Sequence, residues 1–265
     1  MDKNVKNASH FLSLIVPVYR QEKTIVKNIE HIKSVLDTIR YNYEIIVVID
    51  GILDKALDNL KAAKIPHTKI LAYSDNQGKS FAIRLGMHHA EGDYVMFMDS
   101  GMEIDTSGIS MLIEHMEWYN ADIIVGSKRH PASLVHYPPI RKILSYGYYF
   151  IVKMLFGISI RDTQAGIKLY KKNVIEKILP RLVEKKFAGD LEILVVSKLL
   201  GFKRIYEAPI KLDFTLGNVT SAATLDAVRG IFVDTLAIFY RAYFLKYYKS
   251  PHQRLISPKD LQIIT

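Results

Sequence analysis

Hydrophobic residues follow two different spacings along the first 129 positions of the chain. Continuous apolar runs rich in Val and Ile are typical of strands that are buried on both faces of a sheet. Between them, apolar residues recur every three or four positions, which is the spacing of an amphipathic helix. The pattern predicts strands over residues 11–19, 43–51, 68–74, 92–101 and 121–129, and helices over residues 22–40, 52–64, 79–90 and 107–119. This alternation predicts an α/β fold with a doubly wound, mostly parallel sheet.

The second half of the chain has a less regular pattern. Aromatic and aliphatic residues cover much of one predicted helix, and the last predicted helix is amphipathic and rich in Phe and Tyr. The expected elements are a helix over 141–157, a loop over 162–168, a helix near 171–185, a helix over 189–201, one or two short strands over 202–214, and a long helix over 224–248. We expect the tail from Ser250 to be loose, because it contains two prolines.

No segment predicts a membrane-spanning helix. The two most apolar stretches, residues 143–157 and 231–245, are interrupted by Lys153, Asp234 and Arg241. A spanning helix needs about 20 nearly uncharged residues. The N-terminal residues also lack a long apolar core that ends at a small-residue cleavage site. We therefore expect a cytoplasmic protein.

Composition and charge narrow the classes of function. The 265 residues contain no cysteine, which excludes a disulfide framework, a thiolate metal site and a cysteine nucleophile. The net charge is +9, and residues 128–186 alone hold 13 basic and 3 acidic residues. Such a block is either a solvated surface or a binding surface for anionic lipid, a phosphate-bearing ligand or nucleic acid. Because large apolar side chains are interspersed among these cations, we expect no nucleic-acid partner.

Polar side chains stand where the predicted strands end, at the edge where open α/β sheets bind ligands. Asp50, Asp99 and Ser127 occupy such positions, and Glu103 and Asp105 lie within six residues of Asp99. Oxygen ligands this close together suit a hard divalent ion such as Mg²⁺ or Mn²⁺. The alternative is that a strand-end Asp only caps the helix that follows.

Three further groups of residues could carry chemistry. Gly78 and Lys79 begin a predicted helix, whose backbone N–H groups and ammonium could hold a phosphate or diphosphate. Asp190 begins another helix, where it could complement the helix dipole or act as a general base toward an acceptor hydroxyl. The cations that flank a proline-bearing loop could bind a phosphate through charge-assisted hydrogen bonds; they are Lys128, Arg129, Arg141 and Lys142.

The final helix, with aromatic residues on one side and Lys and Arg at its margins, suits an interface between water and lipid. The alternatives are a core helix or a contact in a homo-oligomer.

These motifs together resemble the inverting family 2 glycosyltransferases with a GT-A fold, and most closely the polyprenyl (dolichyl) phosphate mannosyl- and glucosyltransferases. VPVYRQE (16–22) resembles the opening VPxYNE, VVIDG (47–51) resembles VDDGS, and GSKRH (126–130) resembles GSR. NQGKSFAIRLGMHHAEGDYVMFMDSGME (76–103) resembles NxGKGxAxxxGxxxAxGDYVxFxDADLQ. IRDTQAGIKLYKK (160–172) resembles the DTQxGFKLF loop.

The resemblance implies a role for each matching residue. The nucleotide would be bound by Pro17, Tyr19, Glu22, Asp50, Gly78, Lys79 and Asp99. The metal ion, Mg²⁺ or Mn²⁺, would be held by Asp99 and by Glu103, which stands where the lipid-phosphate enzymes have a metal-binding Gln. The acceptor phosphate would meet Lys128, Arg129, Arg141 and Ser145, and the transferred sugar would meet Asp162, Thr163 and Gln164. The catalytic set would be Asp99, Arg141 and, for a hydroxyl acceptor, Asp190.

The resemblance also implies an activity and a domain organisation. Residues 1–223 would form the GT-A domain, with a nucleotide-binding half over about 11–129 and an acceptor half over about 130–223. Residues 224–265 would form a membrane-associating helix and tail. The enzyme would transfer one sugar from a UDP- or GDP-linked donor to a polyprenyl phosphate on the cytoplasmic face of a membrane. The alternatives are transfer to a glycan hydroxyl, and an inactive GT-A protein that binds a nucleotide or a membrane.

Three departures from the family pattern bear on these expectations. Ile49 replaces the first Asp of the second-strand pair, and Gly101 replaces the second Asp of the DxD motif. TLGNVTS (215–221) stands where relatives carry an Arg and a Ser-Lys pair. The first departure bears on which nucleotide base is bound, the second on the metal site, and the third on the contact with a lipid phosphate.

Overall fold

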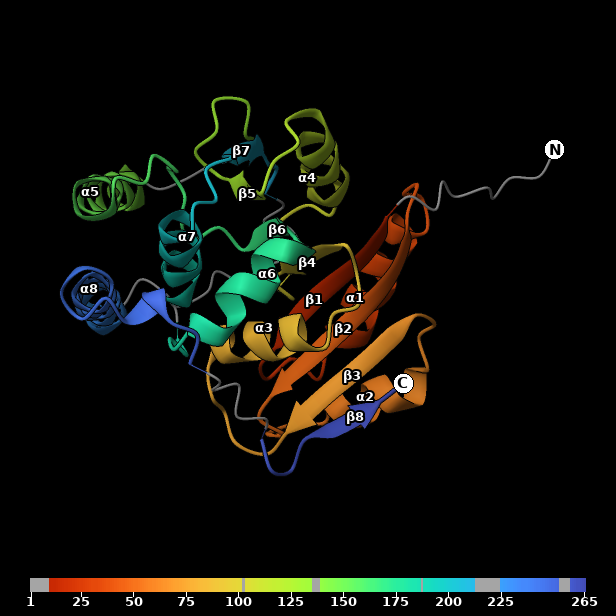
Figure 1. Cartoon of the computed structure of the whole chain (residues 1–265). Coiled ribbons are helices and arrows are strands. Elements are labelled where there is room, and N and C mark those ends of the chain that lie inside the picture. Colours follow the sequence, from red (N-terminus) through yellow and green to blue (C-terminus); the bar gives the residue numbers. More distant parts are fainter. Residues whose placement is uncertain (1–9, 102, 135–138, 187, 213–224, 253–257) are drawn as a thin grey trace.

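An eight-stranded sheet runs through the part of the chain that the structure describes, with the strand order β7-β5-β6-β4-β1-β2-β3-β8 (Figure 1). The computed structural model describes residues 10–265 apart from residues 102, 135–138, 187, 213–224 and 253–257. The strands are β1 (Phe11–Val18), β2 (Asn42–Asp50), β3 (Thr68–Tyr73), β4 (Tyr94–Met98), β5 (Ile123–Ser127), β6 (Ile167–Lys171), β7 (Ile205–Pro209) and β8 (Gln262–Ile264).

The sheet is mixed and mostly parallel, which confirms the predicted fold class. Strand β1 pairs in parallel with β2 and β4, β2 with β3, and β5 with β7. Strand β6 is antiparallel to both β4 and β5, and β8 is antiparallel to β3. Because β6 reverses the direction twice, β5 runs the same way as β4. The carboxyl ends of β1 to β5 therefore lie at one edge of the sheet.

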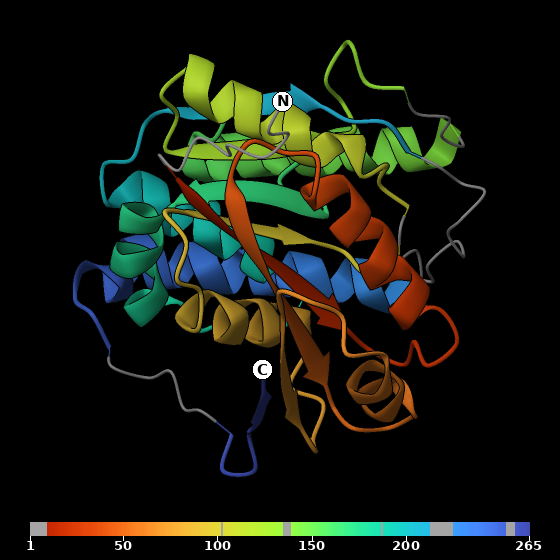
Figure 2. The same cartoon turned by 90° about the vertical axis from the view of Figure 1, so that its right-hand side faces the viewer.

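Helices cover both faces of the sheet (Figures 1 and 2). One face packs against α1 (Ile25–Leu36), α2 (Ala56–Ala63) and α4 (Ser107–Trp118). The other packs against α3 (Lys79–His88), α5 (Pro139–Phe156), α6 (Lys172–Ile178), α7 (Gly189–Leu199) and α8 (Leu225–Phe239). The alternation along β1 shows how the strands separate two cores: Leu14 and Val16 belong to the first core, and Ile15 belongs to the second.

Strand β6 differs from the prediction of a loop over 162–168 followed by a helix from 171. Ile167 and Leu169 pack in one core and Tyr170 packs in the other, which is the alternation of a strand. The predicted helix near 171–185 is also shorter, because α6 ends at Ile178 and a 3₁₀ turn over Leu179–Arg181 follows. The strand is only five residues long, so its period of two is difficult to distinguish from a short helical run.

The two ends of the C-terminal segment also differ from their predictions. The final helix is predicted to continue to residue 248, but α8 ends at Phe239 and is followed by a π-helical turn, η2 (Tyr240–Phe244), and a 3₁₀ turn, η3 (Tyr247–Lys249). The predicted loose tail is wrong for the last described residues. Strand β8 pairs with β3, and the Asp260 carboxylate accepts a hydrogen bond of 2.7 Å from the backbone N–H of Ser74.

Candidate active site

The residues predicted to bind the donor gather at the edge formed by the carboxyl ends of the parallel strands. Asp50 ends β2, Asp99 directly follows β4, and Tyr19 directly follows β1. Lys79 and Asp190 come to the same edge, because each lies in the first turn of its helix, α3 and α7. The sheet thus brings together side chains that are up to 171 positions apart, from Tyr19 to Asp190.

Four charged side chains of alternating sign form the centre of this site. The Lys79 ammonium lies 2.7 Å from Asp99 Oδ1 and 3.9 Å from Asp190 Oδ2. The other oxygen of Asp190 lies 2.6 Å from Lys168 Nζ, which also donates a hydrogen bond of 2.8 Å to the carbonyl of Ala165. The order Asp99, Lys79, Asp190, Lys168 leaves each inner charge between two opposite ones.

Burial and the neighbouring charges shift the pKa values of the two lysines in different directions. Burial lowers the pKa of Lys168, and the adjacent Asp190 carboxylate only partly offsets this. Burial also acts to lower the pKa of Lys79, but Asp99 and Asp190 outweigh it, so that its pKa is raised. Both ammonium groups lie over the ring of Phe97, at 5.0 Å for Lys168 and 5.7 Å for Lys79, which adds a cation–π contribution.

Gly166 makes room for the Asp99 side chain. The backbone N–H of Asp99 donates a hydrogen bond of 2.8 Å to the carbonyl of Gly166. A Cβ atom on Gly166 would lie 2.3 Å from Asp99 Oδ2, which no side chain could occupy without displacing the carboxylate. Gly166 therefore leaves the space that the Asp99 carboxylate occupies, and a larger residue here would displace that carboxylate.

Asp99 does not cap the helix that follows it, which was the alternative explanation for its position. The backbone N–H of Ser107, the first residue of α4, donates a hydrogen bond of 2.9 Å to Asp105 instead. The Asp99 side chain keeps 44% of its surface exposed. It is therefore available to a ligand at the edge of the sheet.

The donor set fits a divalent ion that is shared with a substrate. Within the described residues, no group of three or more His, Asp or Glu side chains could hold an ion by itself. Mg²⁺ commonly binds through one or two carboxylates and completes its shell with water and substrate phosphates. Asp99 and Glu103, four positions later, could supply the one or two carboxylates of such a site, while Gly101 supplies no side-chain ligand.

Three backbone N–H groups at the start of α3, where the sequence predicts phosphate binding, have acceptors within the protein. The N–H of Gly78 donates to Asp50 at 2.9 Å, and those of Ser80 and Phe81 donate to the carbonyl of Lys185 at 3.0 and 3.2 Å. A Cβ atom on Gly78 would lie 2.5 Å from the same carbonyl. The contact that α3 makes with the charged centre of the site is through the side chain of its first residue, Lys79, and the predicted contact with a phosphate stays a prediction.

Asp50 has a role in the fold that the sequence did not predict. Its carboxylate is 3% exposed and accepts hydrogen bonds from the backbone N–H groups of Gln77 (2.7 Å) and Gly78 (2.9 Å) and from the Tyr73 hydroxyl (2.9 Å). These bonds fix the loop that leads into α3. A contact between Asp50 and the nucleotide stays a prediction.

The loop after β1 is fixed in a similar way. The backbone N–H of Glu22 donates to Asp54 at 3.0 Å, and the Glu22 carboxylate accepts a hydrogen bond of 3.2 Å from the backbone N–H of Lys55. Pro17 lies in β1, and Tyr19 is 46% exposed with the Arg20 guanidinium 5.3 Å from its ring. The structure thus places the predicted nucleotide-pocket residues beside the end of β2.

The predicted acceptor residues converge beyond the end of β5. Arg129 donates hydrogen bonds to the carbonyl of Arg161 (2.7 Å) and to the hydroxyl of Ser145, and its guanidinium lies 4.6 Å from the ring of Tyr146. The backbone N–H of Lys128 donates to Asp162 at 3.0 Å.

Three predicted residues complete this side of the site. Thr163 is buried, and the Gln164 Nε2 atom is buried without a hydrogen-bond partner among the described residues. Arg141 lies in α5, and its side chain is outside the described part of the structure.

Comparisons with known proteins define the class. The model of glycosyl transferase family 2 matches residues 13–179, so the chain belongs to that family and is a glycosyltransferase. The fold is similar to that of glucosyl-3-phosphoglycerate synthase from Mycobacterium tuberculosis in complex with Mn²⁺, UDP-glucose and phosphoglyceric acid. The TM-score is 0.64 at 14% identity, with 87% of this chain and 80% of that chain covered. The predicted GT-A fold is confirmed.

Curated relatives are also similar over most of the sequence. A dolichyl-phosphate beta-glucosyltransferase of Trichomonas vaginalis is 30% identical over 245 residues, which cover 88% of this chain and 75% of the relative. One from Saccharomyces cerevisiae is 30% identical over 261 residues, which cover 90% of this chain and 77% of the relative. The predicted resemblance to the polyprenyl phosphate enzymes of this family is confirmed.

Two residues at the centre of the site lie outside the predicted set. Lys168 is fully buried in β6 beside Asp190, and Gly166 makes room for Asp99. Lys168 could have been found from its position, because Ile167 and Leu169 on either side belong to the opposite core. A lysine that shares a strand face with the buried Tyr170 needs an anionic partner.

Proposed function

We propose that the protein transfers one sugar, with inversion, from a nucleotide diphosphate sugar to a polyprenyl phosphate at a membrane surface. The names of the relatives favour glucose as the sugar and a dolichyl-type lipid as the acceptor. The main support is the pairing of Asp190 with two lysines: one of its oxygens lies 2.6 Å from Lys168 Nζ and the other lies 3.9 Å from Lys79 Nζ.

This arrangement favours an acceptor that is already ionised. A hydroxyl acceptor needs a general base that takes its proton, and Asp190 is the residue predicted for that task. Held between two ammonium groups, Asp190 acts instead as a counter-ion. A phosphate acceptor needs no base, only cations that position it, and Lys128 and Arg129 lie beside the predicted sugar-contacting residue Asp162.

The donor side would work by stabilising the leaving group. An oxygen of the acceptor phosphate forms a bond to the anomeric carbon while the bond from that carbon to the diphosphate breaks, and the diphosphate keeps the electron pair. Asp99 and Glu103 would hold Mg²⁺ or Mn²⁺, which when bound acts as a Lewis acid toward the diphosphate. The Lys79 ammonium adds a second positive charge near this group.

The remaining residues would position the two substrates. Pro17, Tyr19 and Glu22 would line the nucleotide pocket, and Asp162, Thr163 and Gln164 would surround the sugar. The buried Gln164 amide, which has no hydrogen-bond partner among the described residues, is a suitable donor to a sugar hydroxyl.

The requirement for a phosphate on the acceptor tests the proposal. UDP- and GDP-glucose and the corresponding mannose donors would be offered with Mg²⁺ or Mn²⁺ and a short polyprenyl phosphate. The matched control acceptor is the polyprenol of the same chain length, which has a hydroxyl in place of the phosphate. We expect a glycolipid product with the phosphate and none with the alcohol. Equal transfer to both, or transfer to a glycan hydroxyl alone, would contradict the proposal.

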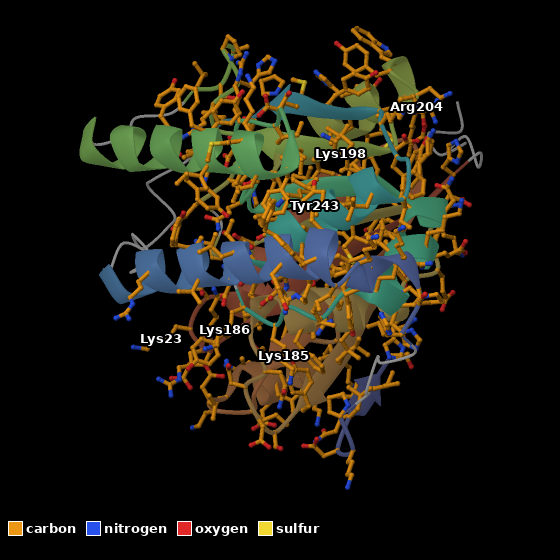
Figure 3. The ribbon with its side chains drawn as sticks, turned by 60° about the vertical axis from the view of Figure 1, so that its left-hand side comes forward. Lys23, Lys185, Lys186, Lys198, Arg204 and Tyr243 are labelled. Carbon is orange, nitrogen blue, oxygen red and sulfur yellow. The ribbon has the colours of Figure 1, made fainter. Side chains whose placement is uncertain are left out.

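The membrane part of the proposal rests on helices α5 and α8, which run side by side across one face of the molecule (Figure 3). The Tyr148 hydroxyl hydrogen-bonds the Thr235 hydroxyl at 3.0 Å, and Phe156 contacts the rings of Phe239 and Tyr243. Large apolar side chains of both helices, of η2 and of the residue that follows it remain exposed: Tyr146, Phe150, Met154, Phe232, Val233, Leu236, Tyr240, Tyr243, Phe244 and Leu245. We call these ten residues the aromatic face.

Basic residues border the aromatic face. Lys185 and Lys186 are exposed and lie next to α8 (Figure 3), and Lys246 and Lys249 follow η2. An apolar surface bordered by cations suits the interface of an anionic membrane. Among the described helices, none is long and apolar enough to cross a bilayer. The bordered aromatic face supports peripheral binding, which we propose takes place on the cytoplasmic face.

Removing two aromatic rings from this face should weaken binding to lipid. In the Tyr240→Ser/Phe244→Ser variant, we expect co-sedimentation with phosphatidylcholine–phosphatidylglycerol vesicles to fall at least about tenfold, because each lost ring removes about 1 kcal/mol or more of apolar burial. The control is Trp118→Ser, which removes an 80% exposed ring from α4 on the other face of the sheet. Equal losses in both variants would contradict binding through the aromatic face.

A further inference from the structure

Lys79 stands between two carboxylates and contacts one of them more closely. Its Nζ atom lies 2.7 Å from Asp99 Oδ1 and 3.9 Å from Asp190 Oδ2. Asp190 is held from the other side by Lys168, whose Nζ atom is 2.6 Å from Asp190 Oδ1. Lys79 therefore contacts Asp99 directly, and a rotation about its side-chain bonds would bring its ammonium into contact with Asp190.

An ammonium on Asp99 Oδ1 competes with a divalent ion for this carboxylate, so an ion binds Asp99 more tightly when Lys79 is elsewhere. We propose that Lys79 exchanges partners, pairing with Asp99 in the empty site and with Asp190 when an ion and a diphosphate occupy Asp99. Lys168 is then a positioning residue, which fixes Asp190 as the second partner. The inference rests on the proposed function for the metal ion at Asp99.

The surroundings of Lys168 explain why it can serve as a fixed anchor. Its side chain is fully buried, its ammonium also donates to the Ala165 carbonyl at 2.8 Å, and it lies over the Phe97 ring. These contacts leave Asp190 Oδ2 as the oxygen that faces Lys79. The exchange of partners leaves no buried charge without an opposite one in either state, which keeps its free-energy cost low.

The effect of two substitutions on Mn²⁺ affinity tests the exchange. Bound and free Mn²⁺ would be measured by electron paramagnetic resonance in the presence of UDP and, separately, of GDP. Asp190→Asn removes the second partner, so Lys79 stays on Asp99, and we expect about tenfold weaker Mn²⁺ binding. Lys168→Met leaves Asp190 without its anchor and draws Lys79 to it, so we expect about tenfold tighter binding.

The opposite changes in Mn²⁺ affinity distinguish a positioning role for Lys168 from a purely structural one. If Lys168 and Asp190 only support the fold, both substitutions weaken Mn²⁺ binding, and the inference is wrong. The matched control is Lys171→Met on the same strand, whose ammonium donates to Asn120 instead. We expect it to leave Mn²⁺ affinity unchanged.

A second measurement is available if Lys168→Met does not fold. In a Lys79→Met background, no ammonium competes for Asp99, so Asp190→Asn should no longer change Mn²⁺ affinity. A persistent tenfold loss in that background would overturn the inference. A crystal structure with Mn²⁺ and the preferred nucleotide should show Lys79 Nζ on Asp190 Oδ2 and away from Asp99.

These outcomes are distinguishable from a failure of the proposed function. If no lipid phosphate accepts a sugar but the Mn²⁺ affinities change as expected, the proposed function fails and the exchange stands. If transfer occurs and the affinities do not change with opposite signs, the exchange fails alone. Absence of Mn²⁺ binding to the unsubstituted protein with either nucleotide would also overturn the exchange.

Discussion

Asp99→Asn should lower the rate of sugar transfer by about 10²- to 10⁴-fold, because it removes the negative charge that would hold the divalent ion. The structure indicates that the fold would survive. The side chain is 44% exposed, and its backbone hydrogen bond to Gly166 does not depend on the carboxylate. The measurement is the steady-state rate of glycolipid formation at saturating donor and metal, with thermal unfolding as the check on the fold.

The control for this substitution is Asp58→Asn, which removes the same charge from an exposed position on α2. We expect it to retain full activity. An Asp99→Asn enzyme that keeps more than about a tenth of the activity would argue against a metal-assisted departure of the diphosphate. The Lys79 ammonium, 2.7 Å from Asp99 Oδ1, would then be the next candidate for stabilising the leaving group.

Asp50→Ala should lower the free energy of unfolding by about 3 kcal/mol, because it leaves buried donors without an acceptor. The donors are the backbone N–H groups of Gln77 and Gly78 and the Tyr73 hydroxyl. Urea denaturation followed by circular dichroism would measure the change. We expect Asp50→Asn to lose less, because its amide oxygen can still accept some of these bonds.

This pair of variants also separates two roles of Asp50. If the carboxylate mainly fixes the loop before α3, stability falls in both variants and nucleotide affinity falls only as the loop loosens. If Asp50 mainly contacts the nucleotide, Asp50→Asn weakens nucleotide binding while unfolding stays unchanged. That second result would contradict the prediction.

The first half of the chain, residues 11–129, was predictable in most respects because its elements are long and strongly periodic. Buried strands such as residues 43–51 read as continuous apolar runs, and α1 carries four buried Ile and Leu residues at helical spacing. The same pattern placed Asp50, Asp99 and Ser127 at strand ends, where the structure has them. Local pattern and global fold agree in this half, which is the condition for reliable prediction.

The contacts inside the site were less predictable because they join distant parts of the chain. Nothing near Lys79 in the sequence indicates that the carbonyl of Lys185 would accept hydrogen bonds from the backbone N–H groups of Ser80 and Phe81. Likewise, the pairing of Lys168 with Asp190 depends on the position of β6 between β4 and β5, and β6 lies where the end of a loop and the start of a helix were predicted. Tertiary arrangement, and not residue type, decides such contacts.

The pairing of β8 with β3 has a consequence for synthesis on the ribosome. Ala72 of β3 pairs with Gln262 of β8, which is synthesised 190 positions later. At about 5–20 residues per second, the delay is about 10–40 s. During that time the outer edge of β3 in the nascent chain has no partner strand, and an unpaired edge of this kind can pair with other chains.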